Sequence, residues 1–208
     1  MDFTYREILK WGDKREEGVN PHMVKLIKEK FGLTDADFRE KHLPGSQPVK
    51  LDKPSLLKPG QLIFLKSIVG SENIQTDDFS RAKYSYGKFY AELLDLRLNQ
   101  VPDPPDAVVS PRNHDDIVRI VEFCNDEGIP VIPVGGQSSV TGALRAPNGG
   151  IALDMTKYLN KIVRLNTINK TVTVQAGISG PAFEEELNRH GYTCGHFPQS
   201  FEYSTVGG

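Results

Sequence analysis

The segment Pro133-Val134-Gly135-Gly136-Gln137-Ser138-Ser139-Val140-Thr141-Gly142-Ala143 carries the strongest structural signal in this sequence of 208 residues. It directly follows the apolar run of residues 130–134, which predicts a buried strand of a parallel sheet. Ligands of such sheets bind beyond the carboxyl ends of the strands. Because Gly135 and Gly136 carry no Cβ, we expect positive φ angles there, with consecutive N–H groups turned toward one anion. Further hydroxyl donors come from Ser138, Ser139 and Thr141.

This pattern predicts a loop that binds phosphate, although glycine pairs also form ordinary tight turns. The loop is neither a Walker loop nor a GxGxxG fingerprint, because the required residues do not follow at the required spacing. Residues 145–150 show no helical period, so loop N–H groups would bind the phosphates without a helix dipole. Kinases and Rossmann dehydrogenases are therefore disfavoured.

The sequence around this loop alternates between strands and a helix. Residues 107–110 and 151–155 are apolar runs that predict strands, and Asn113 and Gly128 cap an amphipathic helix between them. Together with residues 130–134 they predict a right-handed βαβ unit with a parallel sheet.

An antiparallel part follows. Residues 161–165 and 171–175 predict two antiparallel strands around a turn. Gly180-Pro181 predicts the start of a helix that ends at Gly191 and buries Phe183 and Leu187. The fold class expected from the residues is therefore α+β.

The first hundred residues have a helical pattern instead. Asn20-Pro21 and Gly32 predict the two ends of one helix, Thr34 with Asp37 predicts a second short helix through Phe38, and residues 61–69 predict a third. Three prolines in residues 101–106 favour an extended connector. We therefore expect a helical N-terminal region, residues 1–100, that acts as scaffold or interaction surface, and a second domain over residues 101–208.

Composition limits the function classes. Hydrophobic residues make up 38% and charged residues 25% of the chain, and mean hydropathy is −0.39, as in a globular soluble protein. The formal net charge of −2, without marked clustering, argues against nucleic acid as a partner. We find no apolar run of about 18 residues and no signal-peptide pattern, so we expect a cytoplasmic protein. Cys124 and Cys194 are expected to be reduced thiols.

A second polar and aromatic segment closes the sequence: His196-Phe197-Pro198-Gln199-Ser200-Phe201-Glu202-Tyr203-Ser204-Thr205-Val206-Gly207-Gly208. Hydroxyl donors, aromatic rings and a glycine pair suit the approach of a large planar or phosphorylated ligand.

These motifs resemble a known family. Residues 133–142, Gln175-Ala176-Gly177 and residues 196–208 resemble the FAD-binding half of the vanillyl-alcohol-oxidase and p-cresol-methylhydroxylase (PCMH) flavoprotein superfamily. Four motifs narrow the resemblance to relatives of alkyldihydroxyacetonephosphate synthase, namely Trp11-Gly12, Ser85-Tyr86-Gly87-Lys88, residues 105–109 and residues 195–205. The resemblance implies that residues 101–208 are the N-terminal part of a PCMH-type FAD-binding domain.

The resemblance also implies the cofactor residues. The loop matching residues 133–139 surrounds the FAD diphosphate in this family, and the segment matching residues 199–205 runs along the cofactor. The residues expected to bind FAD are Pro133, Val134, Gly135, Gly136, Gln137, Ser138, Ser139, Thr141, Gly142, Pro198, Gln199, Ser200, Ser204, Thr205, Gly207 and Gly208. Members with covalent flavin carry a histidine where this sequence has Gln137, so we expect non-covalent binding there.

His196 matches a histidine near the family's active site and is the candidate catalytic residue. An unperturbed pKa of about 6.5 suits proton transfer near neutrality, although a structural histidine at a turn is the alternative. His190, Cys194 and His196 have ligand-like spacing but no fourth ligand, so we expect no metal site. Cys194 has no recognisable base and is not expected to be a nucleophile.

The implied activity is flavin-dependent replacement of an acyl by an alkyl chain in ether-lipid synthesis. An FAD-dependent 2-hydroxy-acid oxidoreductase of lactate or glycolate type is the alternative within the superfamily. A non-catalytic α/β binding module is the alternative from another class. The expected partners are FAD and a small-molecule or lipid-like substrate, and the resemblance allows a homodimer and a peripheral membrane contact. The family's cap domain and catalytic tyrosine and arginine lie beyond the position of Gly208, so we expect an N-terminal fragment that is inactive alone.

Overall fold

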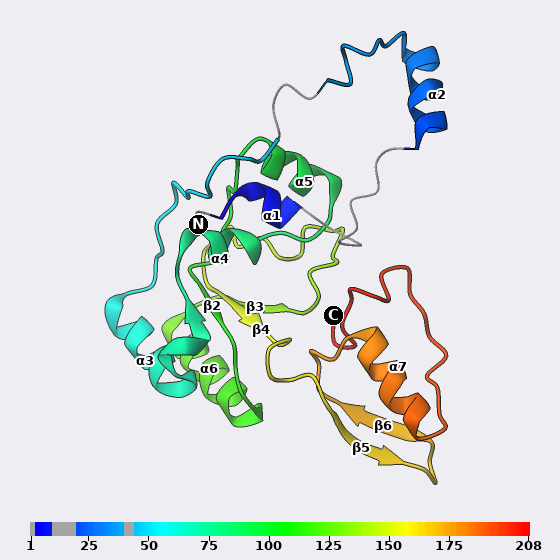
Figure 1. Ribbon diagram of the computed structural model, residues 1–208. Coiled ribbons are helices and arrows are strands. Elements are labelled where there is room, and N and C mark those ends of the chain that lie inside the picture. The colour runs from blue at the N-terminus through cyan, green and yellow to red at the C-terminus, as the bar shows by residue number, and fades with distance from the viewer. Residues whose placement is uncertain (1–2, 10–19, 40–43) are drawn as a thin grey trace.

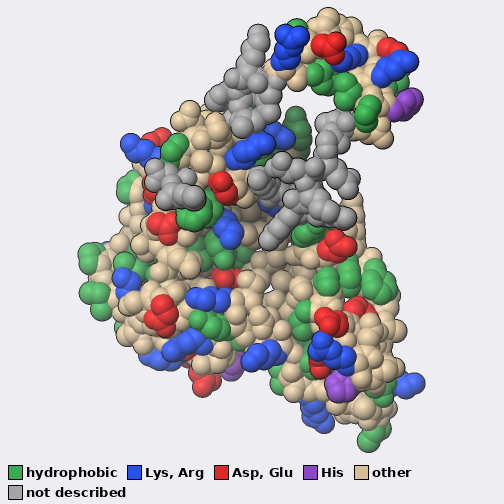
Figure 2. Space-filling model, viewed as in Figure 1, with side chains coloured by type: hydrophobic (Ala, Val, Ile, Leu, Met, Phe, Trp, Pro, Cys, Tyr) green, Lys and Arg blue, Asp and Glu red, His purple; other side chains and the backbone are tan. Residues whose placement is uncertain are grey.

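The computed structural model describes residues 3–9, 20–39 and 44–208 (Figure 1). The Trp11-Gly12 motif lies outside these residues. Acidic and basic side chains are intermingled over the face of the molecule seen in Figure 2. Among the described helices, none combines the length and the apolar character that crossing a membrane requires.

A four-stranded sheet with the order β1-β2-β4-β3 forms the centre of the fold. Strands β2 (Ala107–Val109) and β3 (Val131–Val134) both pair in parallel with β4 (Ile151–Asp154), which lies between them. The predicted parallel sheet is therefore confirmed. Every residue of β2 and β4 is buried, which explains their continuous apolar sequences.

Two helices, α3 (Pro59–Val69) and α6 (His114–Glu127), cover one face of this sheet (Figure 1). The core on this face consists of Leu65, Ile68, Val69, Ile74, Ala107, Val109, Ile120, Cys124, Ile151 and Leu153. Helix α6 begins and ends where its caps predict: the Asn113 side chain accepts a hydrogen bond from the Asp116 N–H, and Gly128 is left-handed at φ 65°. On the other face Val108, Val134, Leu144 and Ala152 form a smaller core.

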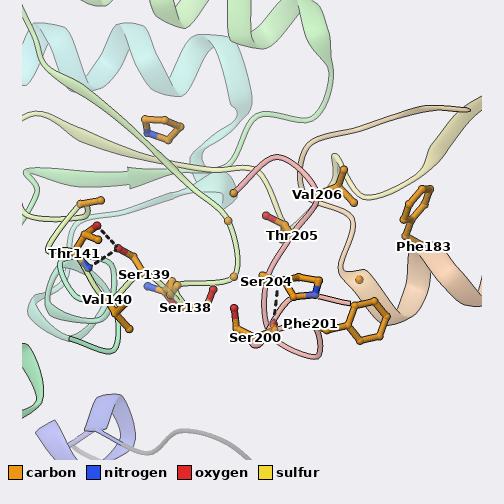
Figure 3. A pocket seen from close by; sticks show the side chains of 18 of the residues that line it. Ser138, Ser139, Val140, Thr141, Phe183, Ser200, Phe201, Ser204, Thr205 and Val206 are labelled. Atoms are coloured by element: carbon orange, nitrogen blue, oxygen red, sulfur yellow. Dashed lines mark hydrogen bonds between the residues drawn. The ribbon is translucent and has the colours of Figure 1, made fainter. Parts of the chain in front are cut away.

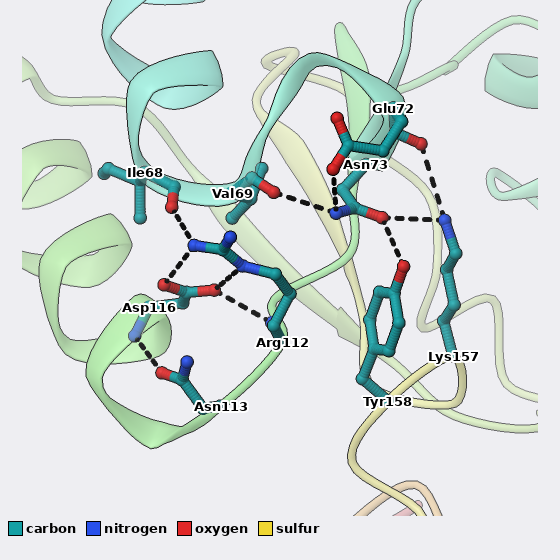
Figure 4. Close-up of polar contacts among 9 residues, drawn as sticks. All are labelled: Ile68, Val69, Glu72, Asn73, Arg112, Asn113, Asp116, Lys157 and Tyr158. Atoms are coloured by element: carbon teal, nitrogen blue, oxygen red, sulfur yellow. Dashed lines mark hydrogen bonds and ion pairs between the residues drawn. The ribbon is translucent and has the colours of Figure 1, made fainter.

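The first hundred residues contribute to the same sheet. Strand β1 (Ile74–Gln75), which the sequence did not predict, pairs antiparallel with β2. It follows the short 3-10 helix η1 (Ser71–Asn73), whose buried Asn73 accepts hydrogen bonds from Lys157 and Tyr158 (Figure 4). Arg112 joins the carbonyl of Ile68 in α3 to Asp116 in α6. These contacts cross residue 101, and the division into two domains there stays a prediction.

Helices α1 (Tyr5–Leu9), α4 (Asp78–Lys83) and α5 (Tyr90–Arg97) form a separate core with Tyr86. Helix α2 (Pro21–Phe31) begins after the Asn20 cap and ends at left-handed Gly32, as predicted, and none of its residues is buried.

The short helix predicted from Thr34 through Phe38 is wrong, because these residues form a turn. The Asp37 carboxylate accepts hydrogen bonds from the N–H and the hydroxyl of Thr34, at 2.7 and 2.9 Å. This local bonding satisfies the polar groups without a continuing helix. The helix predicted for residues 61–69 is present and starts earlier, at Pro59.

A separate antiparallel pair, β5 (Ile162–Asn166) and β6 (Thr171–Val174), packs against α7 (Gly180–Arg189). Phe183 and Leu187 are buried in this contact, as predicted. The α+β class, with one parallel and one antiparallel part, is confirmed. The two parts are joined through residues 155–161, directly after β4, which brings α7 near the carboxyl end of the parallel sheet (Figure 1).

Candidate cofactor site

The glycine loop, residues 135–144, follows directly on the carboxyl end of β3 and contains no helix. Its conformation differs from the prediction in one respect. Gly135 and Gly136 do not have positive φ angles; the left-handed residues of the loop are Gln137, at φ 56°, and Gly142, at φ 73°. The two glycines are needed for another reason, namely their contact with the C-terminal segment of the chain.

The C-terminal segment, residues 194–208, packs directly against the two glycines. A Cβ on Gly135 would overlap the Thr205 hydroxyl, and a Cβ on Gly136 would overlap the Tyr203 carbonyl oxygen. The absence of side chains therefore permits the close approach of two backbone segments. The two segments that the sequence analysis singled out meet in space (Figure 3).

Backbone hydrogen bonds hold the end of the C-terminal segment in place. Val206 donates to the Ile178 carbonyl at 2.9 Å, and Gly207 donates to the Ala176 carbonyl at 2.9 Å. Gly180, at the start of α7, donates to the Ser204 carbonyl at 3.2 Å. Nearer its start, the buried Glu184 carboxylate accepts hydrogen bonds from the N–H groups of Cys194 and Gly195.

A cavity of about 620 Å³ lies between the glycine loop and the C-terminal segment. This volume is within the range of small-molecule and cofactor sites. The predicted residues that line it are Pro133, Gly135, Gly136, Gln137, Ser138, Ser139, Thr141, His196, Pro198, Ser200, Ser204, Thr205 and Gly208. Val134, Gly142, Gln199 and Gly207 do not line it: Val134 is buried in the sheet core, and Gln199 is exposed.

The sequence reasoning missed an apolar part of the lining. The additional residues are Val140, Ala143, Leu144, Gly180, Phe183, Cys194, Phe201 and Val206. Phe183 was predicted only as a core residue of α7, and Phe201 lies in the quoted C-terminal motif. No local signal distinguishes such residues from ordinary core, because facing a cavity depends on which elements pack together.

The polar part of the cavity offers hydrogen-bond donors without cations. Among the described residues, no partner accepts from the backbone N–H groups of residues 135–140 or pairs with the Ser138 hydroxyl. The Thr205 hydroxyl is buried and also lacks a partner within the described chain. No lysine or arginine of the described residues lines the cavity. Unpaired neutral donors of this kind fit a diphosphate, whose oxygens accept hydrogen bonds.

His196 lines the cavity and is exposed, and its ring forms no hydrogen bond with another described residue. His190 lies at the end of α7, 3.4 Å from Glu186, and does not line the cavity. Within the described ranges, no three histidine, cysteine or acidic residues are grouped so that they could hold a metal ion.

A buried carboxylate lies beside the glycine loop but has its partners already. Asp154, at the end of β4, accepts hydrogen bonds from the Tyr84 hydroxyl at 3.1 Å, the Ser110 hydroxyl at 3.3 Å and Thr156. Burial, and then the Asp154 charge, raise the pKa of Tyr84 above its usual value. Tyr84 therefore remains a protonated donor that ties α4 to the sheet.

Comparison with known proteins identifies the class. Residues 105–208 match a family described as FAD binding domain, and this is half of the chain. The chain therefore belongs to the FAD-binding-domain family, and FAD is its cofactor.

Two curated relatives show which members of this family the chain resembles. The chain is 32% identical over 196 residues to alkyldihydroxyacetonephosphate synthase of Trypanosoma brucei brucei, covering 90% of this chain and 32% of that protein. It is 31% identical over 144 residues to a glycolate oxidase subunit of Bacillus subtilis (strain 168), covering 69% of this chain and 28% of the other. It thus spans about a third of the length of these relatives.

A solved structure of alkyldihydroxyacetonephosphate synthase matches with a TM-score of 0.83 at 28% identity, covering 97% of this chain and 42% of that one. A solved structure of p-cresol methylhydroxylase matches with a TM-score of 0.52 at 17% identity, covering 66% of this chain and 26% of that one. The resemblance to synthase-like FAD-linked oxidases and the PCMH-type fold are therefore confirmed.

Proposed function

We propose that this chain is the FAD-binding part of a flavoenzyme that replaces an acyl by an alkyl chain on a lipid precursor. The observation that carries the proposal is the structural match to alkyldihydroxyacetonephosphate synthase, which extends over 97% of the chain and so includes its N-terminal helical region. The N-terminal Ser85-Tyr86-Gly87-Lys88 motif and residues 195–205 support it.

In the proposed FAD site, the polar and the apolar residues of the cavity have different roles. The N–H groups of residues 135–140 and the Ser138 hydroxyl bind the diphosphate, and the Thr205 hydroxyl donates from the opposite side. Phe183, Phe201 and Val206 exclude water from the apolar part. Bound FAD supplies the redox-active ring that the chemistry requires, and the protein orients it. His196 accepts or donates a proton at its ring nitrogen beside the cavity.

FAD binding at Gln137 is non-covalent in this proposal. An amide cannot form the link that a histidine forms, and the Gln137 side chain donates to the Lys83 carbonyl instead of facing a ligand. Denaturation in acid followed by filtration tests this point, because non-covalent flavin passes through the filter.

An FAD-dependent 2-hydroxy-acid oxidoreductase is the second candidate, favoured by the likeness to the glycolate oxidase subunit. The two functions are separated by assaying the protein at its natural length. Incubation with an acyl dihydroxyacetone phosphate and a long-chain alcohol should yield an ether product by mass spectrometry. Reduction of a dye by glycolate or D-lactate, without ether product, would reject the first proposal in favour of the second.

Four further properties also belong to this proposal. They are a homodimer, a peripheral membrane contact, cytoplasmic localisation, and weak or absent FAD binding by the 208-residue chain alone. Gel filtration with light scattering and a flavin titration of the isolated chain test the first and the last. Stoichiometric FAD in the isolated chain would contradict the expected weak binding.

A further inference from the structure

Residues 83–92, which we call the support segment, lie behind the glycine loop, and they do not line the cavity. Two hydrogen bonds join the segments. The Lys88 N–H donates to the Ser139 carbonyl at 2.6 Å, and the Gln137 side-chain amide donates to the Lys83 carbonyl at 2.6 Å. Ser138, which lines the cavity (Figure 3), lies in the chain between these two anchored residues.

Close packing accompanies the hydrogen bonds. Gly87 is buried, and a Cβ there would overlap the Ser139 carbonyl oxygen. Gly87 does not have a positive φ angle, so its conformation does not itself require glycine. The small residue is required because the glycine loop lies directly against it.

Glu92 shapes the support segment. Its side chain is 0% exposed, and Oε2 accepts hydrogen bonds from the N–H groups of Gly87 and Phe89, both at 3.2 Å. These two N–H groups flank Lys88, whose own N–H is left to donate to the glycine loop. The carboxylate thus folds a tight turn that presents one donor outward.

The anchors determine where the loop donors point. In a planar trans peptide the carbonyl and the N–H point in opposite directions. Because the Ser139 carbonyl is fixed toward Lys88, the N–H of Val140 in the same peptide points away from the support segment. Gln137 is held in the left-handed region, which turns the chain between the two anchors.

We propose that the support segment holds the glycine loop in its diphosphate-binding shape before FAD arrives, with Glu92 and the side chain of Gln137 as positioning groups that do not touch the cofactor. This inference rests on the proposed FAD site. Its physical basis is preorganisation, because a loop already ordered loses less conformational entropy on binding.

Two variants test the inference from behind the loop, in the protein at its natural length. Gly87→Ala pushes on the Ser139 carbonyl, and Gln137→Asn tolerates a left-handed backbone but is one methylene too short to reach Lys83. Dissociation constants are measured for FAD, for ADP, which carries the diphosphate, and for riboflavin, which does not. Gln61→Asn is the matched control, because it breaks the Gln61–Glu127 hydrogen bond outside the site.

In each variant we expect the affinities for FAD and for ADP to fall by the same factor, which is about tenfold for Gln137→Asn. The affinity for riboflavin should stay unchanged, and the control should bind all three ligands normally. Equal loss for all three ligands, or no loss for any, would overturn the inference. Gly136→Ala identifies a failure of the site itself: if FAD affinity survives that change, the proposed site falls and the positioning role falls with it.

Discussion

The two walls of the cavity are built differently. The glycine loop offers backbone N–H groups and is held from behind by the support segment, whereas the C-terminal segment offers side chains and is held mainly at its end. Each wall has a buried glutamate that folds a turn: Glu92 gathers the N–H groups of Gly87 and Phe89, and Glu184 gathers those of Cys194 and Gly195.

The difference lies in what each turn does. The turn at Glu92 lies outside the cavity and passes a hydrogen bond to the loop. The turn at Glu184 contains Cys194, which lines the cavity, and leads at once to exposed His196. In the proposed function the glycine loop therefore binds the diphosphate, and the C-terminal segment adds the Thr205 hydroxyl and His196, the candidate for proton transfer.

The largest expected effect comes from separating the walls. Gly136→Ala places a methyl group on the Tyr203 carbonyl, a backbone atom that cannot move aside alone. We expect FAD affinity to fall by up to about 100-fold, since overpacking costs about 1–3 kcal/mol and here acts on the binding surface. Flavin fluorescence titration measures the loss. Gly60→Ala, where the added methyl meets no neighbour, should bind FAD normally. Unchanged affinity in Gly136→Ala would reject the proposed FAD site between the two walls.

His196→Ala tests whether the C-terminal segment acts in chemistry. We expect turnover to fall about 100-fold, as for loss of a general acid or base, while FAD affinity changes less than about threefold because the exposed ring is not part of the diphosphate grip. Steady-state kinetics and flavin titration on the same preparation separate the two effects. Normal turnover in His196→Ala would reject the catalytic role and favour the alternative, a structural histidine at a turn.

Thr205→Val asks whether the one buried unpaired hydroxyl among the described cavity residues serves the cofactor. Without FAD, removing an unsatisfied hydroxyl should stabilise the protein by about 1 kcal/mol, which raises Tm by about 2–4 °C. With FAD, affinity should fall about tenfold because one donor is lost. Calorimetry without flavin measures the rise in Tm, and calorimetry with added flavin measures the loss of FAD affinity. A fall in Tm without FAD would mean that the hydroxyl has a partner in the protein.

The smallest effect concerns Glu92. Burial is the largest cause that raises the pKa of this carboxyl above its ordinary value of 4.5. A raised folded pKa contributes stability below the unfolded pKa, and this contribution is lost as pH rises through the folded value. Glu92→Gln stays neutral and keeps an acceptor for Gly87 and Phe89. We expect its Tm, relative to the natural protein, to rise between pH 4 and pH 7, and FAD affinity to stay normal. A relative Tm that falls over this range would contradict the direction of the shift.

Much of the fold was predictable because its signals are local. The Asn113 and Gly128 caps set the ends of α6, and the apolar runs of β2 and β4 reflect burial on both faces. The helix predicted from Thr34 and Asp37 was wrong because the side-chain hydrogen bonds that cap a helix also close an isolated turn. The two-residue strand β1 carries too little pattern to be predicted, and it exists because β2 offers it an edge.

For the site, the sequence predicted two segments but not their contact. Gly135 and Gly136 were expected to supply unusual φ angles; they supply space for Tyr203 and Thr205 instead. Gly87 was noticed only as part of the Ser85-Tyr86-Gly87-Lys88 motif. Glu92 gave no sign of a role, since a glutamate three residues into a helix is an ordinary cap.

The order of residues along the chain was enough to predict strands β2 to β6, the ends of α6 and the neutral donors of the loop, because each depends on neighbours a few positions away. Packing alone determined that two glycines face a distant carbonyl and hydroxyl, that Phe183 borders a cavity, and that the Lys88 N–H, between the two N–H groups bound to Glu92, meets the loop. Those features depend on distances between residues far apart in sequence, which are fixed only when all the elements pack together.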